Sequence, residues 1–260
     1  MIENRPDANF TLAANGCAKA KPDGYTICLL LRDNVSISSF VEKMQYNVMT
    51  DFAPIGLLVY LQNVIVANAS TPFNTFQEMV AYSRNHPDKI NYTAFGASVA
   101  ILAWLTRESG ARMTYILYKG GPEATLAFLN NTIQVMYLAV GNPGVVADVN
   151  SGRMKGLAVP GDKRNPLMPG VPSFSEIGLP KFATKSWLGI FAPAGTPKDA
   201  LAKLSSELAA IVLTPEFRDQ QVTPFGFEAV GSAPEEFARF IVEDRKAGTE
   251  LAKLAGPRQP

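Results

Sequence analysis

The chain has 260 residues, 47% of them hydrophobic, which is enough for one large α/β domain or two smaller lobes with buried cores. Its 24 Lys and Arg against 23 Asp and Glu leave a formal charge of +1, without the basic field that nucleic acids demand. Proline, glycine and amide residues interrupt the longest apolar stretches, so none supplies the roughly 20 residues that cross a bilayer. We therefore expect neither a nucleic-acid partner nor a membrane span.

The first ten residues, MIENRPDANF, have neither the basic region nor the apolar region of a secretory signal, so the sequence as it stands predicts no export. Cys17 falls in a predicted helix and Cys28 in a predicted strand, both in apolar surroundings. Single cysteines in such surroundings usually behave as small buried hydrophobes. We therefore favour two free thiols over a disulfide, and expect no metal site.

Short runs rich in β-branched and aromatic residues alternate with amphipathic helical patterns of about ten residues, the pattern of an α/β protein with mainly parallel strands. Most of these runs are continuously apolar, as strands covered on both faces should be. The predicted strands are 25–31, 53–60, 63–68, 90–95, 114–118, 133–140, 154–160, 186–193 and 227–231.

The helices between the strands have recognisable start signals. Asn74 can cap the helix NTFQEMVAYSRN, with Gln77 returning the capping bond. Pro197 opens a second helix, and Ser232, with Glu235 three residues on, opens a third. We interpret the apolar stripe of the second helix as core packing and not as a partner surface.

A long connection over residues 159–185 is rich in proline and glycine and has little periodicity. Ordered connections of this length often carry function or join lobes. A second break lies near residue 61, where two predicted strands follow each other with almost no loop. If the chain crosses from one lobe to the other near residue 61 and back near residue 186, the first lobe is discontinuous in sequence and the second is continuous.

Three predicted strands end in a corner of small residues and pass straight into a helix. The three stretches are NYTAFGASVAILAWL, YILYKGGPEATLAFL and VMYLAVGNPGVVADV, with Ser98, Pro122 and Pro143 at the expected helix starts. Each corner exposes backbone N–H groups at the positive end of a helix dipole. If the strands are parallel neighbours, the corners share one sheet edge and favour an anion there. Glycine is also common at ordinary strand-to-helix turns, so a purely structural role stays open.

Phosphate binding and catalysis have less support in the sequence. Neither G-x-x-x-x-G-K-[ST] nor G-x-G-x-x-G occurs, and Lys119 precedes its glycines where the phosphate-loop geometry needs it after them. The one histidine, His86, is expected at the surface and not as a general base. No nucleophile elbow or Cys/His cluster is present, and no pair of acids stands out by spacing, although a carboxylate enzyme stays open.

A series of stretches, in order along almost the whole chain, resembles the periplasmic solute-binding proteins of tripartite tricarboxylate transporters, also called the Bug family. No single stretch would be specific, but the ordered series is. The matching stretches are ENRPDA, AKPDGYTICLL, DFAPIGLL, NVIVAN, KINYTAFGAS, YKGGPEA, GRMKGLAVPGDKR, VPSFSEIGLP, SWLGIFAPAGTP and SAPEEFARFI.

The resemblance implies an α/β fold of the type II periplasmic-binding-protein class, with two lobes, a hinge and an interlobe cleft. Lobe one would comprise residues 1–61 and 186–260, and lobe two residues 62–185. The resemblance also implies that family members carry a signal peptide and a first strand and helix before ENRPGA. Residues IENRPDA stand at the start of this sequence, so we expect an N-terminally truncated lobe one.

The resemblance further implies ligand-binding residues in the strand-to-helix loops of both lobes. In lobe two these would be Gly96, Ala97 and Ser98, together with Lys119, Gly120 and Gly121. In lobe one they would be Arg32 and Asp33, with Trp187 near the hinge. We expect the charges of Lys119 and Arg32 to be solvated more readily than bound to ligand.

The sequence departs from the family pattern at the expected site. The usual G-x-G-S-x-x-H loop appears as GASVAI, and a strand end that is often MFDNL reads MYLAV. Arg32 stands where small residues are usual. These changes predict a more apolar pocket around Phe95, Tyr137 and Leu138.

The resemblance therefore implies an extracytoplasmic solute receptor, periplasmic, without catalytic activity or cofactor. Its expected partners are a small carboxylated solute and the membrane subunits of a tripartite transporter, and we expect a monomer that binds no nucleic acid. A cytosolic sensor or enzyme on the same fold, and a non-functional truncated product, are the alternatives.

Overall fold

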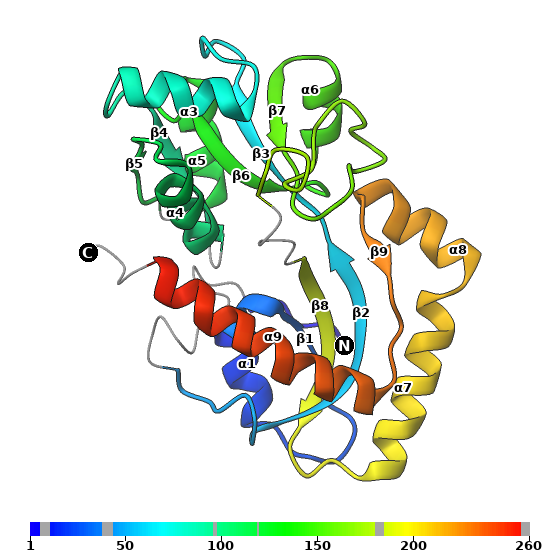
Figure 1. Cartoon of the computed structure of the whole chain (residues 1–260). Helices are drawn as coiled ribbons and strands as arrows, with labels where there is room; N and C mark the ends of the chain where they lie inside the picture. Colours follow the sequence, from blue (N-terminus) through cyan, green and yellow to red (C-terminus); the bar gives the residue numbers. More distant parts are fainter. Residues whose placement is uncertain (6–10, 38–43, 96–97, 119, 180–184, 256–260) are drawn as a thin grey trace. The chain divides into compact units, whose positions relative to one another are not determined.

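The computed structural model describes residues 1–5, 11–37, 44–95, 98–118, 120–179 and 185–255. The chain forms two compact units, one of residues Met1–Tyr60 with Ser186–Pro260 and one of residues Leu61–Lys185 (Figure 1). Each unit has its own β-sheet, and its helices pack on that sheet.

Unit one contains a four-stranded sheet in the order β1-β8-β2-β9. Strand β1 pairs antiparallel with β8, and β2 pairs antiparallel with β9. The strands are β1 (Cys28–Leu31), β2 (Phe52–Leu61), β8 (Ser186–Pro193) and β9 (Glu228–Ala229), and the helical segments are α1 (Thr11–Ala18), η1 (Asp33–Ile37), α7 (Lys198–Val212), α8 (Pro215–Phe217), η3 (Arg218–Val222), η4 (Thr223–Phe225) and α9 (Pro234–Ala255).

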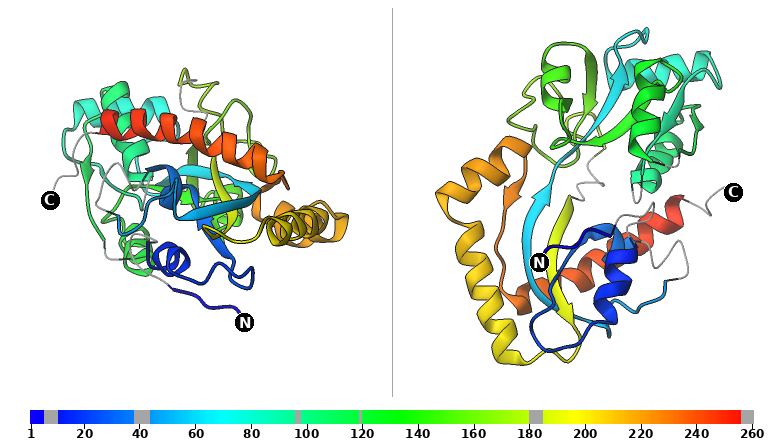
Figure 2. Two further views of the ribbon diagram at one scale, coloured as in Figure 1. Left: turned by 90° about the horizontal axis from the view of Figure 1, so that it is seen from below. Right: turned by 180° about the vertical axis from the view of Figure 1, so that it is seen from behind.

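Helix α9 lies against the strands of unit one (Figure 1), and its aromatic side chains pack with those of β8. The Phe237 ring lies 5.3 Å from the Trp187 ring and 5.1 Å from the Phe191 ring, measured between centroids. Gly189 stands between these two strand residues, and a Cβ there would clash with the Phe237 ring. The alternate residues of β8, Ile190 and Ala192, pack with leucines of α7, as the period of two in a strand requires. Figure 2 shows α9 and α7 as separate layers beside the strands.

The two cysteines form a disulfide between α1 and β1, so the expectation of free thiols is wrong. Helix α1 packs on β1 and β8, which brings the Cα atoms of Cys17 and Cys28 to 6.1 Å. That separation lies within the range a disulfide can bridge. The elements were predicted correctly for both residues, but their packing against each other was not visible in either pattern.

We expect loss of this disulfide to destabilise unit one by about 3 kcal/mol, because it closes a short loop in the unfolded chain. The two cysteines are 11 residues apart in sequence, which sets that scale. The Cys17→Ser/Cys28→Ser variant and the oxidised wild type are compared by urea denaturation. Equal unfolding free energies would contradict a stabilising bond, and adding a reductant to the double variant controls for effects of the reductant itself.

Unit two contains a five-stranded sheet in the order β5-β4-β6-β3-β7. Strand β4 pairs parallel with both β5 and β6, whereas β3 pairs antiparallel with β6 and β7. The strands are β3 (Asn63–Asn68), β4 (Asn91–Thr93), β5 (Thr114–Tyr115), β6 (Val135–Ala139) and β7 (Met154–Ala158), and the helices are α3 (Phe76–Asn85), α4 (Ser98–Ser109), α5 (Gly121–Leu129) and α6 (Val145–Asn150).

The prediction of mainly parallel strands holds only for the β5-β4-β6 part of unit two. Among the pairings between described strands, those of β1, β3 and β9 are antiparallel. A parallel neighbour needs a crossover connection, usually a helix. Strand β3 instead follows β2 directly after one residue, so no crossover sets its direction.

Helix starts also differ from the prediction in detail. Helix α3 is capped by Thr75, whose hydroxyl accepts from the Glu78 N–H, while a Glu78 carboxylate oxygen accepts from the Asn74 N–H. The capping box therefore lies one residue later than predicted. Pro143 lies before α6 and not inside it, because Gly144 caps that helix in a left-handed conformation at φ 85°.

The Ser232 hydroxyl has a different role from the predicted cap, since it accepts from the Leu57 N–H. This bond ties the segment before α9 to β2. The helix itself begins at Pro234, with Glu235 in its first turn.

The connection after β7 is ordered in its described part by a local polar cluster. The Arg164 guanidinium lies 2.9 Å from a Glu176 carboxylate oxygen, and the same carboxylate accepts from the Ser173 N–H. The hydrogen bond from Arg164, with the Ser173 amide, lowers the pKa of Glu176 to about 2. An isolated parallel bridge between Val159 and Ser173 holds the start of the connection to its middle.

Candidate functional site

The three predicted strand-to-helix corners belong to adjacent parallel strands of unit two. Strands β5, β4 and β6 are neighbours and run in one direction, and each is followed by a helix, α5, α4 and α6 respectively. Their carboxyl ends therefore lie at one edge of the sheet, which is the edge where open α/β sheets bind ligands. The prediction that the corners share an edge is confirmed, and we take this edge as the candidate site (Figure 1).

The corner before α5 has open backbone. Gly120 is the N-cap, with an extended backbone and no side-chain capping bond, and Pro122 occupies the first turn. Gly121 is exposed, and a Cβ built there would meet no atom within 4 Å. Neither left-handed backbone nor tight packing explains these two glycines, so the structural role that the sequence left open has no support here. Lys119 lies outside the described residues.

The corner before α4 is described only in part, because Gly96 and Ala97 lie outside the described residues. Ser98 is the first residue of α4, and its N–H donates to the Phe95 carbonyl. The buried hydroxyl of Thr93 donates to the Ile116 carbonyl and so joins the end of β4 to the segment after β5. Two of the three corners are thereby held next to each other.

Apolar side chains adjoin this edge. Phe95 and Leu138 are half-buried and pack against the core of unit two, and Tyr137 is 3% exposed. Ile116 and Tyr118 pack on the same core from the segment after β5. The predicted apolar pocket around Phe95, Tyr137 and Leu138 stays a prediction, since these contacts describe packing and no bound molecule.

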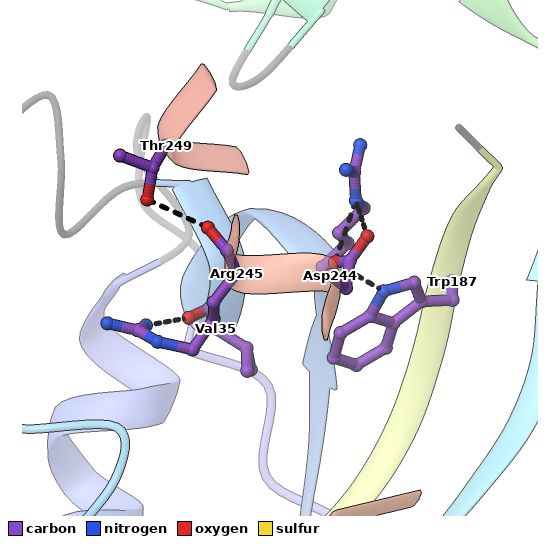
Figure 3. A network of polar contacts seen from close by, with 6 residues as sticks. Val35, Trp187, Asp244, Arg245 and Thr249 are labelled. Carbon is purple, nitrogen blue, oxygen red and sulfur yellow. Dashed lines mark hydrogen bonds and ion pairs between the residues drawn. The ribbon is translucent and has the colours of Figure 1, made fainter. Parts of the chain in front are cut away.

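The unit-one residues Arg32 and Trp187 are brought together by an acid that the sequence did not single out. Arg32 Nε donates to both carboxylate oxygens of Asp244 at 2.9 Å, and Trp187 Nε1 donates to Asp244 Oδ2 at 3.0 Å. Figure 3 shows the Trp187 indole on β8 directed at Asp244 on α9. Arg32 is 2% exposed, so the expectation of a solvated charge is wrong. Asp33 is half-buried at the start of η1.

Helix α9 also holds η1 through Arg245. The Arg245 guanidinium donates to the Val35 carbonyl, and the Thr249 hydroxyl donates to the Arg245 carbonyl (Figure 3). Partial burial lowers the pKa of Arg245 from its usual value. Two successive residues of α9 therefore fix the segment that follows β1, one at Arg32 and one at Val35.

A signal for Asp244 was present in the sequence. Phe237, Ile241 and Asp244 follow the helical spacing i, i+4, i+7, and the first two are buried. An acid on the apolar stripe of a helix is rarely buried without a partner. Its partner could not be identified in the same way, because Arg32 lies 212 residues away along the chain.

Other chemistry has little support among the described residues. His86 is exposed, as predicted, and its ring stacks on Tyr82 with centroids 4.3 Å apart. Within the described ranges, no three His, Cys, Asp or Glu side chains are grouped as metal ligands. Among the helices that the structure describes, none combines the length and the apolar character of a membrane span.

The chain is similar to solute receptors over nearly its full length. The model of the tripartite tricarboxylate transporter family receptor matches residues 1–256. A UPF0065 protein of Bordetella bronchiseptica is 29% identical over 98% of this chain and 76% of its own length.

Two solved structures share the fold. The periplasmic binding protein BugD is 29% identical, with a TM-score of 0.86 over 99% of this chain and 87% of its own. MatC from Rhodopseudomonas palustris, solved with bound malate, is 26% identical, with a TM-score of 0.81 over 93% of this chain and 84% of its own. The predicted α/β periplasmic-binding-protein fold is confirmed by these likenesses. From the family match, this chain belongs to the tripartite tricarboxylate transporter receptor family, whose members bind solutes and are not enzymes.

Proposed function

We propose that this receptor binds a small solute through a carboxylate group at the β5-β4-β6 edge of unit two. The main support for this proposal is that three parallel neighbouring strands end at one edge of the sheet, and that each passes into a helix there. Helix N-termini present unpaired N–H groups and a partial positive charge, both of which favour an anion. MatC, a relative of the same fold, was solved with malate, which is a dicarboxylate.

The proposed ligand-binding residues of unit two are Gly96, Ala97, Ser98, Lys119, Gly120 and Gly121. The open backbone at Gly120 and Gly121 supports the role of these two residues. A carboxylate, with two oxygens and a charge spread over both, can accept from more than one N–H at such corners. The half-buried Phe95 and Leu138 nearby favour a solute whose remainder is partly apolar.

We further propose that the protein works in the periplasm as a monomer, delivers its solute to the membrane subunits of a tripartite transporter, and binds no nucleic acid. The two compact units are then the two lobes of the receptor. The Cys17–Cys28 disulfide supports the location, since disulfides persist in oxidising compartments such as the bacterial periplasm. The near-neutral charge supports the absence of a nucleic-acid partner.

A carboxylate screen tests the proposed function. The purified chain is melted in the presence of acetate, malate, adipate or citrate, which carry one, two, two and three carboxylates. A ligand at 100 times its dissociation constant is expected to add about 2.7 kcal/mol to the free energy of unfolding. Absence of stabilisation by all four carboxylates at about 10 mM would contradict the proposal.

A side chain placed at the open corner separates binding at this edge from binding elsewhere. Gly121→Val is expected to lower the affinity for the best carboxylate about tenfold, because the added group stands over the N–H groups of α5. Gly170→Val is the matched control, since Gly170 is exposed in unit two and its Cβ would also meet no atom within 4 Å. Calorimetric titration measures the affinity of each variant for the carboxylate. Equal affinities would mean that the solute binds away from this corner.

A further inference from the structure

We infer that the Cys17–Cys28 disulfide is a redox switch, which holds residues 11–27 on unit one while it is oxidised and releases them to proteolysis when a dithiol reduces it. The inference does not depend on the proposed binding of a carboxylate. The bond joins helix α1, which ends at Ala18, to the first residue of β1. The connection between the two elements is therefore a loop that the disulfide closes.

Helix α1 has little stability of its own. It has eight residues, and isolated helices of fewer than about 12–15 residues are marginal in water. Its first turn has no acidic residue and its last turn has no basic residue, so charged side chains do not complement its dipole. Its buried residues are Ala14 and Cys17, and the hydrogen bond from Asn15 to Gln45 lies at the exposed surface. Burial of two small side chains is a weak attachment, so the covalent bond contributes much of what holds α1 in place.

The connection between α1 and β1 faces solvent. Lys19 and Lys21 are exposed, and Tyr25 is 93% exposed. Exposed connections are preferred sites of proteolytic cleavage, and the rate of cleavage follows the population of the locally opened form. The state of the disulfide therefore controls how often this connection is open to a protease.

Strand β1 is held by contacts that do not involve the disulfide. Its four residues pair antiparallel with β8. Leu30 is 1% exposed in the core of unit one, and Arg32, directly after the strand, pairs with Asp244 on α9. Opening the bond should then release the segment before Cys28 and leave the sheet of unit one folded.

Thiol–disulfide exchange opens the bond in two steps. Cys28 is half-buried and Cys17 is 3% exposed, so a thiolate of the reductant attacks Cys28 Sγ. A mixed disulfide forms, the Sγ–Sγ bond breaks, and Cys17 leaves as a thiolate that takes up a proton. The second thiol of the reductant then attacks the reductant's own sulfur in the mixed disulfide, which releases Cys28 as a thiol and leaves the reductant oxidised. In total, two electrons and two protons pass from the dithiol to the protein.

The switch couples the lifetime of the chain to the redox state of its compartment. In an oxidising compartment the disulfide persists and the connection stays closed. Where reduced dithiol proteins reach the bond, the segment opens and a protease can remove it. The chain has two cysteines, so no third thiol of its own competes in the exchange.

Limited digestion with trypsin tests the switch, with dithiothreitol as the dithiol. Trypsin cuts after lysine, and in this connection Lys19 precedes alanine while Lys21 precedes proline, which prevents cleavage. Reduction is expected to accelerate the cut after Lys19 on the order of 100-fold, because the opened segment is no longer a closed loop with a sequence separation of 11. The cut after Lys163, which is exposed in unit two, is the internal reference. The ratio of the two rates cancels any loss of trypsin activity in the reductant, and mass spectrometry identifies the fragments.

Two variants are the controls, and three outcomes would overturn the inference. Cys17→Ser/Cys28→Ser should be cut after Lys19 at the fast rate with and without dithiothreitol, and Lys19→Gln should lose this fragment. If the double variant does not fold, the reduced wild type alone provides the test. An unchanged ratio of the cuts after Lys19 and Lys163 would overturn the inference, and so would a bond that stays closed in dithiothreitol by thiol titration. An equal acceleration of the cut after Lys203, exposed on α7, would mean that reduction unfolds unit one as a whole, which would overturn it as well.

Discussion

Asp244→Ala is expected to lower the free energy of unfolding by about 3–5 kcal/mol, because it leaves the buried guanidinium of Arg32 without its counter-charge. Arg32 is 2% exposed and Asp244 9%, so water cannot replace the lost carboxylate at the protein surface. The same change removes the acceptor of the Trp187 indole N–H. Urea denaturation, followed by far-UV circular dichroism, measures the loss.

The matched controls separate the charge from the packing. Asp219→Ala removes an exposed acid from η3 and should change the unfolding free energy by less than about 0.5 kcal/mol. Arg32→Met/Asp244→Leu removes both charges, and should recover most of the stability, since apolar replacements of buried ion pairs are often neutral or better. If Asp244→Ala were as stable as Asp219→Ala, the ion pair would not be buried in solution.

Local patterns in the sequence were enough to predict the candidate edge of unit two. A strand, a small-residue corner and a helix start lie within about 15 residues of one another, and each part has its own propensity signal. The direction of β4, β5 and β6 then followed, because a strand, helix and strand in succession give parallel neighbours. Gly120 and Gly121 were found for this reason.

Contacts between distant parts of the chain could not be predicted in the same way. Arg32 and Asp244 are 212 residues apart, and neither local sequence contains information about the other. Similarly, the disulfide depends on how α1 packs against β1. The antiparallel direction of β3 was missed because the alternating pattern of strands and helices was extended to a strand that no helix precedes.

Phe237→Ala should lower the free energy of unfolding by about 3–5 kcal/mol, the usual cost of removing a fully buried aromatic ring. The ring is 0% exposed and lies between Trp187 and Phe191, so its removal leaves a cavity under α9. Denaturation of the single variant measures this cost. Val242→Ala, on the exposed side of the same helix, is the control and should cost well under about 1 kcal/mol.

Gly189 provides a sharper form of this test, because a Cβ there would lie 2.3 Å from the Phe237 ring and 3.2 Å from the Trp187 ring. Gly189→Ala alone should cost about 1–3 kcal/mol, since its Cβ would clash with the Phe237 ring and force it to move. In the Phe237→Ala background the shortest contacts are gone and the Trp187 ring at 3.2 Å remains, so the same change should cost much less and the two effects should be strongly non-additive. Additive effects in this double-mutant cycle would mean that α9 does not approach β8 as closely as its aromatic contacts indicate, and the position of Asp244 beside Arg32, which depends on the same helix, would then be in doubt as well.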